Sequence, residues 1–170
     1  MCRAQRSGLV GGFAVLVFAT FVAAAAEGSK EAEPGHVRIE NVEVHVSQLG
    51  PVVLLKVKSR AIPVFVDAVV AESILGALSG QKPGRPLTHD LMHTVLEAFD
   101  GRVSQVDVTL QGRVFHGALT VVVREAAKVF DSRSSDAIAL AIHFNAPILV
   151  SRDLLDSAGV ELEKTEGTPL

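Results

Sequence analysis

Two carboxylates, one arginine and three serines stand together in the stretch Phe-Asp-Ser-Arg-Ser-Ser-Asp that ends at Asp136. A helix that begins here would present unpaired amide N–H groups and a partial positive charge, so a phosphate could bind beside Arg133. Asp131 and Asp136 could also hold Mg²⁺ or Mn²⁺, which prefer carboxylate oxygens. Capping is the alternative: Ser134 or Ser135 would bond the first-turn amides, and Asp136 would complement the helix dipole.

A second polar group, Thr88-His89-Asp90, also stands where a helix is expected to begin. Thr88 is the predicted N-cap, and Asp90 would lie in the first turn, where a carboxylate complements the dipole. His89 and Asp90 could form an acid–base or metal-binding pair, because imidazole titrates near neutrality and carboxylates bind divalent cations. The alternative is a solvated histidine without a chemical role.

A third pair of carboxylates, Asp67 and Glu72, precedes Asp131 and Asp136 by a constant 64 residues (131 − 67 = 64). If two halves of the chain packed about a pseudo-twofold axis, the four carboxylates could approach one another as a two-metal phosphodiesterase requires. Alternatively, each carboxylate only flanks its own helix. The sequence contains no H-E-x-x-H, P-loop, G-x-G-x-x-G or G-x-S-x-G motif.

The elements that would position these residues follow from the spacing of apolar residues. Alternation predicts strands and a recurrence every three or four residues predicts helices. Strands are expected over 42–46, 52–57, 62–66, 106–110, 119–123, 129–130 and 147–150, and helices over 68–78, 88–99, 135–144 and 152–157. Pro63 predicts that its strand lies at a sheet edge or begins there.

Two parts of this pattern have the same order, strand-strand-strand-helix. At the constant offset of 64, eight positions are identical over 36 residues without a gap, including Val42 with Val106 and Leu55 with Leu119. We interpret this as an internal duplication. The predicted fold is therefore α+β, with a mixed, largely antiparallel sheet built from a duplicated β-β-β-α unit and helices packed against it.

The N-terminus has the organisation of a secretory signal peptide. Arg3 and Arg6 precede the apolar run 8–22, and small alanines follow over 23–26. We expect an exported protein, periplasmic or secreted, without stable membrane association after cleavage; an uncleaved N-terminal anchor is the alternative. The predicted divisions are a signal peptide (1–26), a flexible linker (27–36), a domain (37–158) and a polar tail (159–170).

Composition narrows the function further. The predicted mature chain carries 14 − 19 = −5 charges, so it lacks the basic footprint common in nucleic-acid-binding proteins. It has no Trp or Tyr and only five Phe, which is few for base-stacking platforms. The one cysteine, Cys2, precedes the predicted cleavage site, which excludes disulfides and Cys-bound zinc from the mature domain. The high apolar content predicts a homo-oligomer.

Four segments, 62–66, 85–92, 130–141 and 146–148, together resemble the bifunctional nuclease (BFN) domain family in order and spacing, over about 37–155. The resemblance implies a mixed α/β domain, usually intracellular, named for a founding member that cuts DNA and RNA without strong base preference. The chain departs from the family pattern in three places: Asp67 replaces a Gly, Val70 replaces a Glu and Ser134 replaces a Pro.

Two functions follow from these observations. The first is an exported, metal-dependent nuclease cutting DNA and/or RNA with little base preference. In it, Asp131 and Asp136 bind Mg²⁺ or Mn²⁺ and belong to the catalytic set with His89 and Asp90, while Thr88, Arg133 and Ser135 hold phosphate. The alternative is a non-catalytic BFN-like domain that binds an anion or a protein partner. The family name favours the nuclease; the acidic charge and the missing Glu at Val70 favour binding.

Overall fold

The computed structural model describes residues 35–81 and 84–162. All of them belong to one compact unit. The predicted signal peptide (1–26), most of the linker and most of the tail lie outside the described residues, so export stays a prediction. Among the described residues, no helix has the length and apolar character needed to cross a membrane.

The described chain contains nine strands and four helices. The strands are β1 (His36–Arg38), β2 (Asn41–Ser47), β3 (Gly50–Val57), β4 (Arg60–Phe65), β5 (Gly101–Gln111), β6 (Val114–Val123), β7 (Ala126–Arg133), β8 (Ile148–Ser151) and β9 (Val160–Glu161). The helices are α1 (Ala68–Ser79), α2 (Thr88–Ala98), α3 (Ser134–His143) and α4 (Arg152–Ala158). Every strand and helix expected from periodicity is present, with shifted ends; β1 and β9 were not expected.

The strands form two sheets, with orders β1-β8-β5-β6-β7 and β2-β3-β4-β9. Only β5 and β8 pair in parallel; all other neighbours are antiparallel. The predicted α+β class with largely antiparallel pairing is therefore confirmed, although two sheets replace the single one expected. Pro63 lies on an open stretch of β4, because β9 pairs only with Arg60 and Ala61.

The duplicated unit is not confirmed, although the order β-β-β-α occurs twice. The hairpins β2–β3 and β5–β6 do keep the offset of 64, since Val42 pairs with Leu55 and Val106 with Leu119. The helices do not, because α1 begins at Ala68 and α3 at Ser134 (134 − 68 = 66). The gap-free offset of 64 is therefore wrong at the helices, and a common origin of the two parts stays a prediction.

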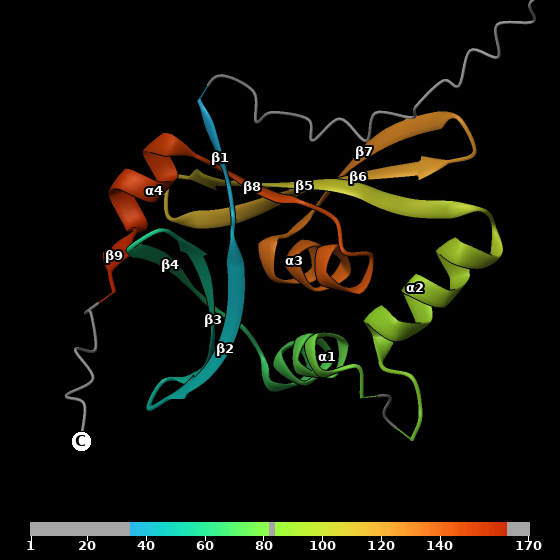
Figure 1. The fold of residues 1–170 in the computed structure, drawn as a ribbon, viewed down its shortest axis with the longest axis horizontal. Coiled ribbons are helices and arrows are strands. Elements are labelled where there is room, and N and C mark those ends of the chain that lie inside the picture. Colours follow the sequence, from blue (N-terminus) through green and yellow to red (C-terminus); the bar gives the residue numbers. More distant parts are fainter. Residues whose placement is uncertain (1–34, 82–83, 163–170) are drawn as a thin grey trace, which may run out of the picture. The chain divides into compact units, whose positions relative to one another are not determined.

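Helix α3 lies between the five-stranded sheet and α1, as Figure 1 shows. Its residues 137–141 are all buried, so it is covered on every side. Close approach to β6 requires Gly117, where an added Cβ would come within 2.6 Å of the Ala137 Cβ. Short side chains thus set the distance between helix and sheet.

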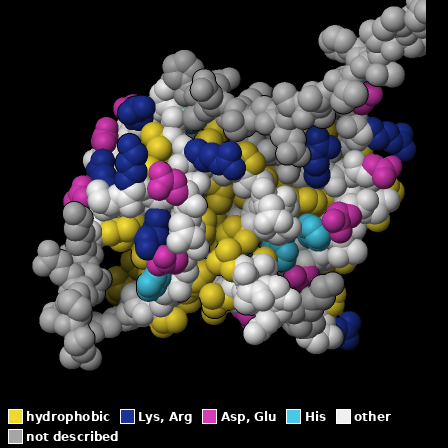
Figure 2. Space-filling view, in the orientation of Figure 1, with side chains coloured by type: hydrophobic (Ala, Val, Ile, Leu, Met, Phe, Trp, Pro, Cys, Tyr) yellow, Lys and Arg dark blue, Asp and Glu magenta, His cyan; other side chains and the backbone are white. Residues whose placement is uncertain are grey.

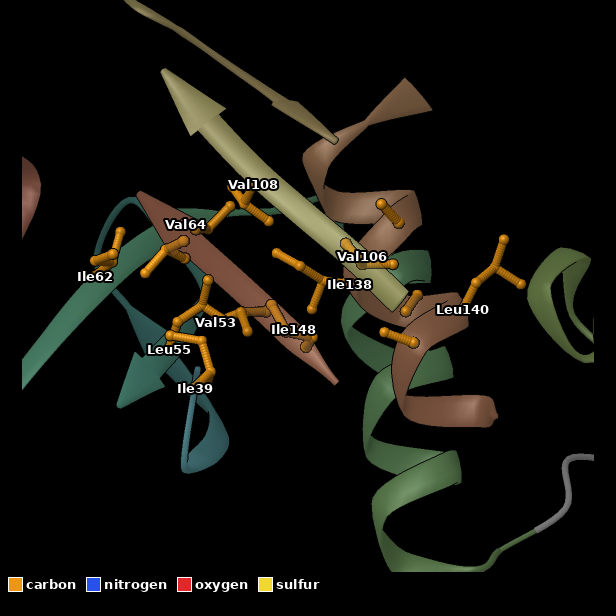
Figure 3. Packing of buried hydrophobic residues seen from close by; sticks show 14 of the residues in the cluster. Ile39, Val53, Leu55, Ile62, Val64, Val106, Val108, Ile138, Leu140 and Ile148 are labelled. Carbon is orange, nitrogen blue, oxygen red and sulfur yellow. The ribbon is translucent and has the colours of Figure 1, made fainter. Parts of the chain in front are cut away.

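The core joins both sheets to α3. Figure 3 shows Ile39, Val53, Leu55, Ile62 and Val64 beside Val106, Val108, Ile138 and Ile148. Each fully buried Val, Leu or Ile contributes about 1.5–3 kcal/mol to folding. Leu140 lies on the other side of α3, away from this group (Figure 3). Hydrophobic side chains also remain visible across the middle of the face in Figure 2, so burial of apolar surface is incomplete.

Candidate active site

Three segments far apart in sequence line one pocket of about 1020 Å³. Asp67 comes from the start of α1, Thr88 and His89 from the start of α2, and Asp131, Arg133 and Asp136 from the junction of β7 with α3. Most of the remaining wall is apolar: Val69, Val70, Met92, Leu96, Leu119, Val121, Val123, Ala126, Phe130 and Leu140. The fold thus brings parts of all three polar motifs together.

Arg133 and Asp136 form the tightest contact in the pocket. Strand β7 ends at Arg133 and α3 begins at once, so Arg133 is the N-cap and Asp136 stands in the first turn, three residues on. The guanidinium donates from Nε to Asp136 Oδ2 at 2.7 Å and from Nη2 to Oδ1 at 2.9 Å. Such a two-point contact orients the planar guanidinium and leaves its remaining N–H groups for another partner.

His89 also contacts Asp136, at the oxygen that Arg133 Nη2 bonds. The side chain is buried, with 7% of the residue exposed, and its Nε2 lies 3.2 Å from Asp136 Oδ1. Because an ionised carboxylate only accepts, Nε2 must carry the proton. The other ring nitrogen, Nδ1, is buried and has no hydrogen-bond partner among the described residues. In this arrangement His89 offers no free nitrogen to the pocket and holds Asp136 in place.

These contacts decide the charge state of the pair. Burial by itself would raise the pKa of the Asp136 carboxyl, but the hydrogen bonds from Arg133 and His89 outweigh it and keep the pKa below its usual range. The same bond with Asp136 raises the pKa of Arg133. Asp136 is therefore ionised and Arg133 charged at neutral pH.

The carboxylates expected to gather about a pseudo-twofold axis do not do so. Asp67 caps α1, accepting a hydrogen bond from the Val70 N–H at 2.9 Å, and its Oδ2 lies 3.8 Å from Arg133 Nη1. Glu72 is exposed and lines a different hollow. The prediction is wrong for Glu72 because α1 turns this side chain away from Asp67. Asp67 approaches Asp136 only through the arginine between them.

The predicted start of α2 needs correction. The N-cap of α2 is Leu87, not Thr88, and Asp90 accepts a hydrogen bond from the Leu87 N–H at 2.8 Å. Asp90 is absent from the residues that line the pocket and lies 4.0 Å from His143 Nε2 on another side of α2. Consecutive helical residues point about 100° apart, so Asp90 does not pair with its neighbour in the sequence.

The junction of β7 with α3 also differs from the capping expected there. The N-cap residue, Arg133, makes no side-chain cap bond, so the predicted capping by Ser134 or Ser135 is wrong. Ser134 is buried, and Ser135 does not line the pocket. The strand runs into the helix without a loop, and the serines follow the backbone into the first turn.

The predicted metal ligands are not arranged as a metal site. The described residues contain no group of three His, Cys, Asp or Glu placed to hold a metal ion. Both oxygens of Asp136 are bonded to Arg133 or His89. The side chain of Asp131 is 86% exposed and lies 3.8 Å from His116 Nδ1. These donors do not fit a bound Mg²⁺ or Mn²⁺ as they stand.

Sequence reasoning missed two residues beside the site. His116 approaches Asp131 because β6 pairs with β7 in the register Ala118 with Asp131. Lys128 lies 5.1 Å from the centre of the Phe130 ring at the pocket wall. The register of β6 with β7 depends on the turn between them, which the sequence analysis did not assign. Alternation alone could have placed Lys128 on the same face as Phe130.

These elements define an α+β domain with a largely apolar pocket, whose charged residues gather where a strand runs into a helix. The bifunctional nuclease domain model matches residues 52–163, and the chain belongs to this family. The chain is also 32% identical over 129 residues to uncharacterized proteins from Mycobacterium tuberculosis strains CDC 1551 and H37Rv, covering 74% of this chain and 77% of each relative. The predicted family is confirmed, and it suggests a nuclease-like or nucleic-acid-binding function.

Proposed function

We propose that the chain is an exported nuclease that cuts phosphodiester bonds of DNA and/or RNA at the pocket lined by Arg133. The observation that carries this proposal is the convergence of Asp67, His89, Arg133 and Asp136 in one pocket of a bifunctional nuclease domain. Arginine is suited to phosphate because its planar N–H groups match two phosphate oxygens.

Arg133 is the phosphate-binding group in this proposal. Asp136 holds one edge of the guanidinium, because it bonds Nε at 2.7 Å and Nη2 at 2.9 Å. The third nitrogen, Nη1, lies 3.8 Å from Asp67 Oδ2, which is beyond hydrogen-bond distance. A phosphate can therefore bond Nη1 without displacing Asp136. His89 acts as a positioning residue, because its Nε2 holds Asp136 and its Nδ1 is buried.

Hydrolysis adds a water oxygen to phosphorus, breaks the P–O bond to the leaving nucleotide and transfers one proton from the water to the leaving oxygen. We assign the proton transfer to Asp131, since both oxygens of Asp136 are already bonded. His116 lies beside Asp131, with its Nδ1 3.8 Å from the carboxylate and no hydrogen bond between them. The predicted requirement for Mg²⁺ or Mn²⁺ enters none of these steps and is tested by the assay.

Little base preference is consistent with the wall of the pocket. Leu119, Val121 and Val123 carry no hydrogen-bonding side-chain group, so this wall cannot read the polar edges of a base. A base would contact it through apolar surface alone, which does not discriminate among the four. Selectivity would then come from phosphate binding.

A specific observation favours the alternative, a domain that binds an anion or a protein without cutting it. His89 Nε2 bonds Asp136 and Nδ1 is buried, so His89 presents no accessible nitrogen to act as acid or base in the pocket. The −5 charge of the predicted mature chain also opposes tight nucleic-acid binding. Both functions use Arg133 to bind an anion, and only the nuclease cleaves the molecule that it binds.

The test is cleavage of single-stranded DNA, double-stranded DNA and RNA by the purified chain, with Mg²⁺, with Mn²⁺ and with chelator. We expect cleavage that Arg133→Ala reduces roughly 100-fold, as for other groups that stabilise developing charge. The matched control is Arg102→Ala: Arg102 is exposed on β5 and pairs with Val122, so it lies on the face opposite Val123 and the pocket. No cleavage by folded wild-type protein would exclude the nuclease.

Export is tested separately, by fractionating cells and sequencing the N-terminus of the recovered protein. Arg3, Arg6 and the apolar run 8–22 support a signal peptide. We expect a mature chain that begins at Glu27. Intact chains in the membrane fraction would instead support the uncleaved anchor.

A further inference from the structure

Strand β2 has an open edge. It lies at one end of its sheet (Figure 1), and no described strand pairs with the side that faces away from β3. The Val66 N–H bonds the Pro51 carbonyl, so Pro51 directs its backbone to β4 and its partner Val46 directs its own away from β3. Because backbone direction alternates along a strand, the same holds for Val42 and Val44. The N–H and C=O groups of these three valines therefore point to the open edge.

The other sheet edges of the described chain are protected against pairing, whereas this one is not. β1 and β9 have only three and two residues, β7 carries Lys128 and β4 carries Pro63. Short strands, lysine and proline stop an edge from pairing with another chain. β2 has seven residues and contains neither lysine nor proline, and Val46 near its end is 87% exposed. Its edge is therefore available to a further strand.

A second β2 fits this edge in one antiparallel register. If Val44 lies opposite its own copy, all seven residues of the strand are paired and Val42 lies opposite Val46. On the other face Glu43 then lies opposite His45, whose imidazole can donate to the carboxylate. A register centred on Glu43 would place two carboxylates opposite each other, and any centre other than Val44 leaves end residues unpaired. The strand is thus complementary to itself, as a two-fold interface requires.

We propose that two copies of this chain pair through β2 about a two-fold axis at Val44, which joins their four-stranded sheets into one continuous sheet. The three facing valine pairs exchange about six backbone hydrogen bonds, two for each pair. On the outer face, the hydrogen bond from Lys56 at 2.7 Å lowers the pKa of Glu43 and keeps its carboxylate ionised opposite His45. A strand of another protein would need its own complement to Glu43 and His45, which β2 itself supplies. This inference does not depend on cleavage.

Cysteines at the facing positions test the register. In a full-length chain that carries Cys2→Ser, the Glu43→Cys variant is mixed with the His45→Cys variant under reducing conditions and then oxidised. Facing residues that exchange no backbone hydrogen bond have Cα atoms about 4.5 Å apart, within the range of a disulfide, whereas the two copies of position 43 lie on a diagonal of about 7–8 Å. We expect disulfide-linked dimers to form in the mixture at least roughly 10-fold faster than in either variant alone, which is the matched control.

Sedimentation and light scattering measure the association itself. Val46→Lys places a charge on the open edge at an exposed position, so it should block pairing without unfolding the chain. At about 100 μM, where pairing of micromolar affinity is nearly complete, we expect the wild type to have about twice the mass of this variant. The matched control is Val114→Lys, since Val114 is 60% exposed at the start of β6, outside this edge, and it should keep the wild-type mass. Circular dichroism checks that each variant is folded.

Three outcomes would overturn the proposal. The first is an equal mass for the wild type and Val46→Lys. The second is a cysteine mixture that forms dimers no faster than the Glu43→Cys or His45→Cys variant alone. The third is a loss of mass in Val114→Lys as large as that in Val46→Lys, because the effect would then come from added charge and not from the β2 edge.

Discussion

The two parts of the chain with the order β-β-β-α use their strand–helix junctions differently. In the first, Asp67 lies between β4 and α1, and its side chain caps the helix. In the second, β7 runs directly into α3, so Arg133 occupies the N-cap without a side-chain cap bond. The Arg133 guanidinium has no acceptor and cannot cap a helix start. It bonds Asp136 instead, and both residues line the pocket. The same element order thus yields a structural cap in one part and a charged site in the other.

The two parts also differ in the lengths of their strands. β5, β6 and β7 have 11, 10 and 8 residues, whereas β2, β3 and β4 have 7, 8 and 6. The longer strands supply Leu119, Val121, Val123 and Phe130, which face α2 across the pocket. The second part therefore provides both the charged residues and one apolar wall.

The largest effect is expected where α3 approaches its sheet most closely. Gly117 pairs with Val108 on β5, whereas the first part pairs Val53 with Val44. A methyl group at position 117 would lie 2.6 Å from the Ala137 Cβ, so Gly117→Ala should lower the free energy of unfolding by about 3 kcal/mol. Urea denaturation measures this. Adding Ala137→Gly should recover part of the loss; no recovery would mean that this contact is not the cause.

A smaller effect is expected for the carboxylate that holds Arg133. Asp136→Asn keeps the side-chain shape but loses the charge that orients the guanidinium, so cleavage should fall roughly 10- to 30-fold. Exposed Glu72→Gln on α1 is the control and should leave the rate unchanged. Cleavage kinetics on one substrate decide this, and equal rates for both variants would leave Asp136 no role at the site.

Two substitutions of Asp67 should separate the stability that comes from capping from the stability that comes from its charge. Asp67→Ala removes the acceptor for the Val70 N–H and should cost about 1 kcal/mol, whereas Asp67→Asn retains a capping oxygen and should cost only a few tenths. Thermal unfolding of the two variants gives the comparison. Equal losses would assign the stabilisation to the Arg133 contact at 3.8 Å instead.

The smallest effect is a pH dependence at His143, where α1, α2 and α3 meet. Burial lowers the pKa of His143. The charge of Asp90 opposes this shift, and the charges of His93 and His89 add to it. The Nε2 atom of His143 lies 3.0 Å from Ser73 Oγ. The unfolded chain then binds the proton more readily, so stability should be constant above about pH 6.5 and fall as pH drops below it. Unfolding curves should show a weaker fall for His143→Gln; identical slopes would contradict this.

Local patterns in the sequence predicted every helix, most strands, the fold class and the family. They could do so because alternation and helical spacing are properties of neighbouring residues. The strand β9 has only two residues and the pairing of β1 depends on β8, so neither carries a pattern of its own. The offset of 64 did not align the helices. It holds between the hairpins β2–β3 and β5–β6, whereas the first residues of α1 and α3 are 66 positions apart.

The sequence by itself determined which residues could do chemistry: Thr88, His89, Asp131, Arg133 and Asp136 all line the pocket. Only the tertiary structure decided what each of them does. The bond between His89 and Asp136 joins residues 47 positions apart, and it exists because α2 packs against α3. Asp90 and Ser135, adjacent in sequence to site residues, are turned away by the helix. A sequence specifies residue types and local periodicity, whereas the partner of a side chain depends on which helix faces meet, and that is decided by packing of the whole core.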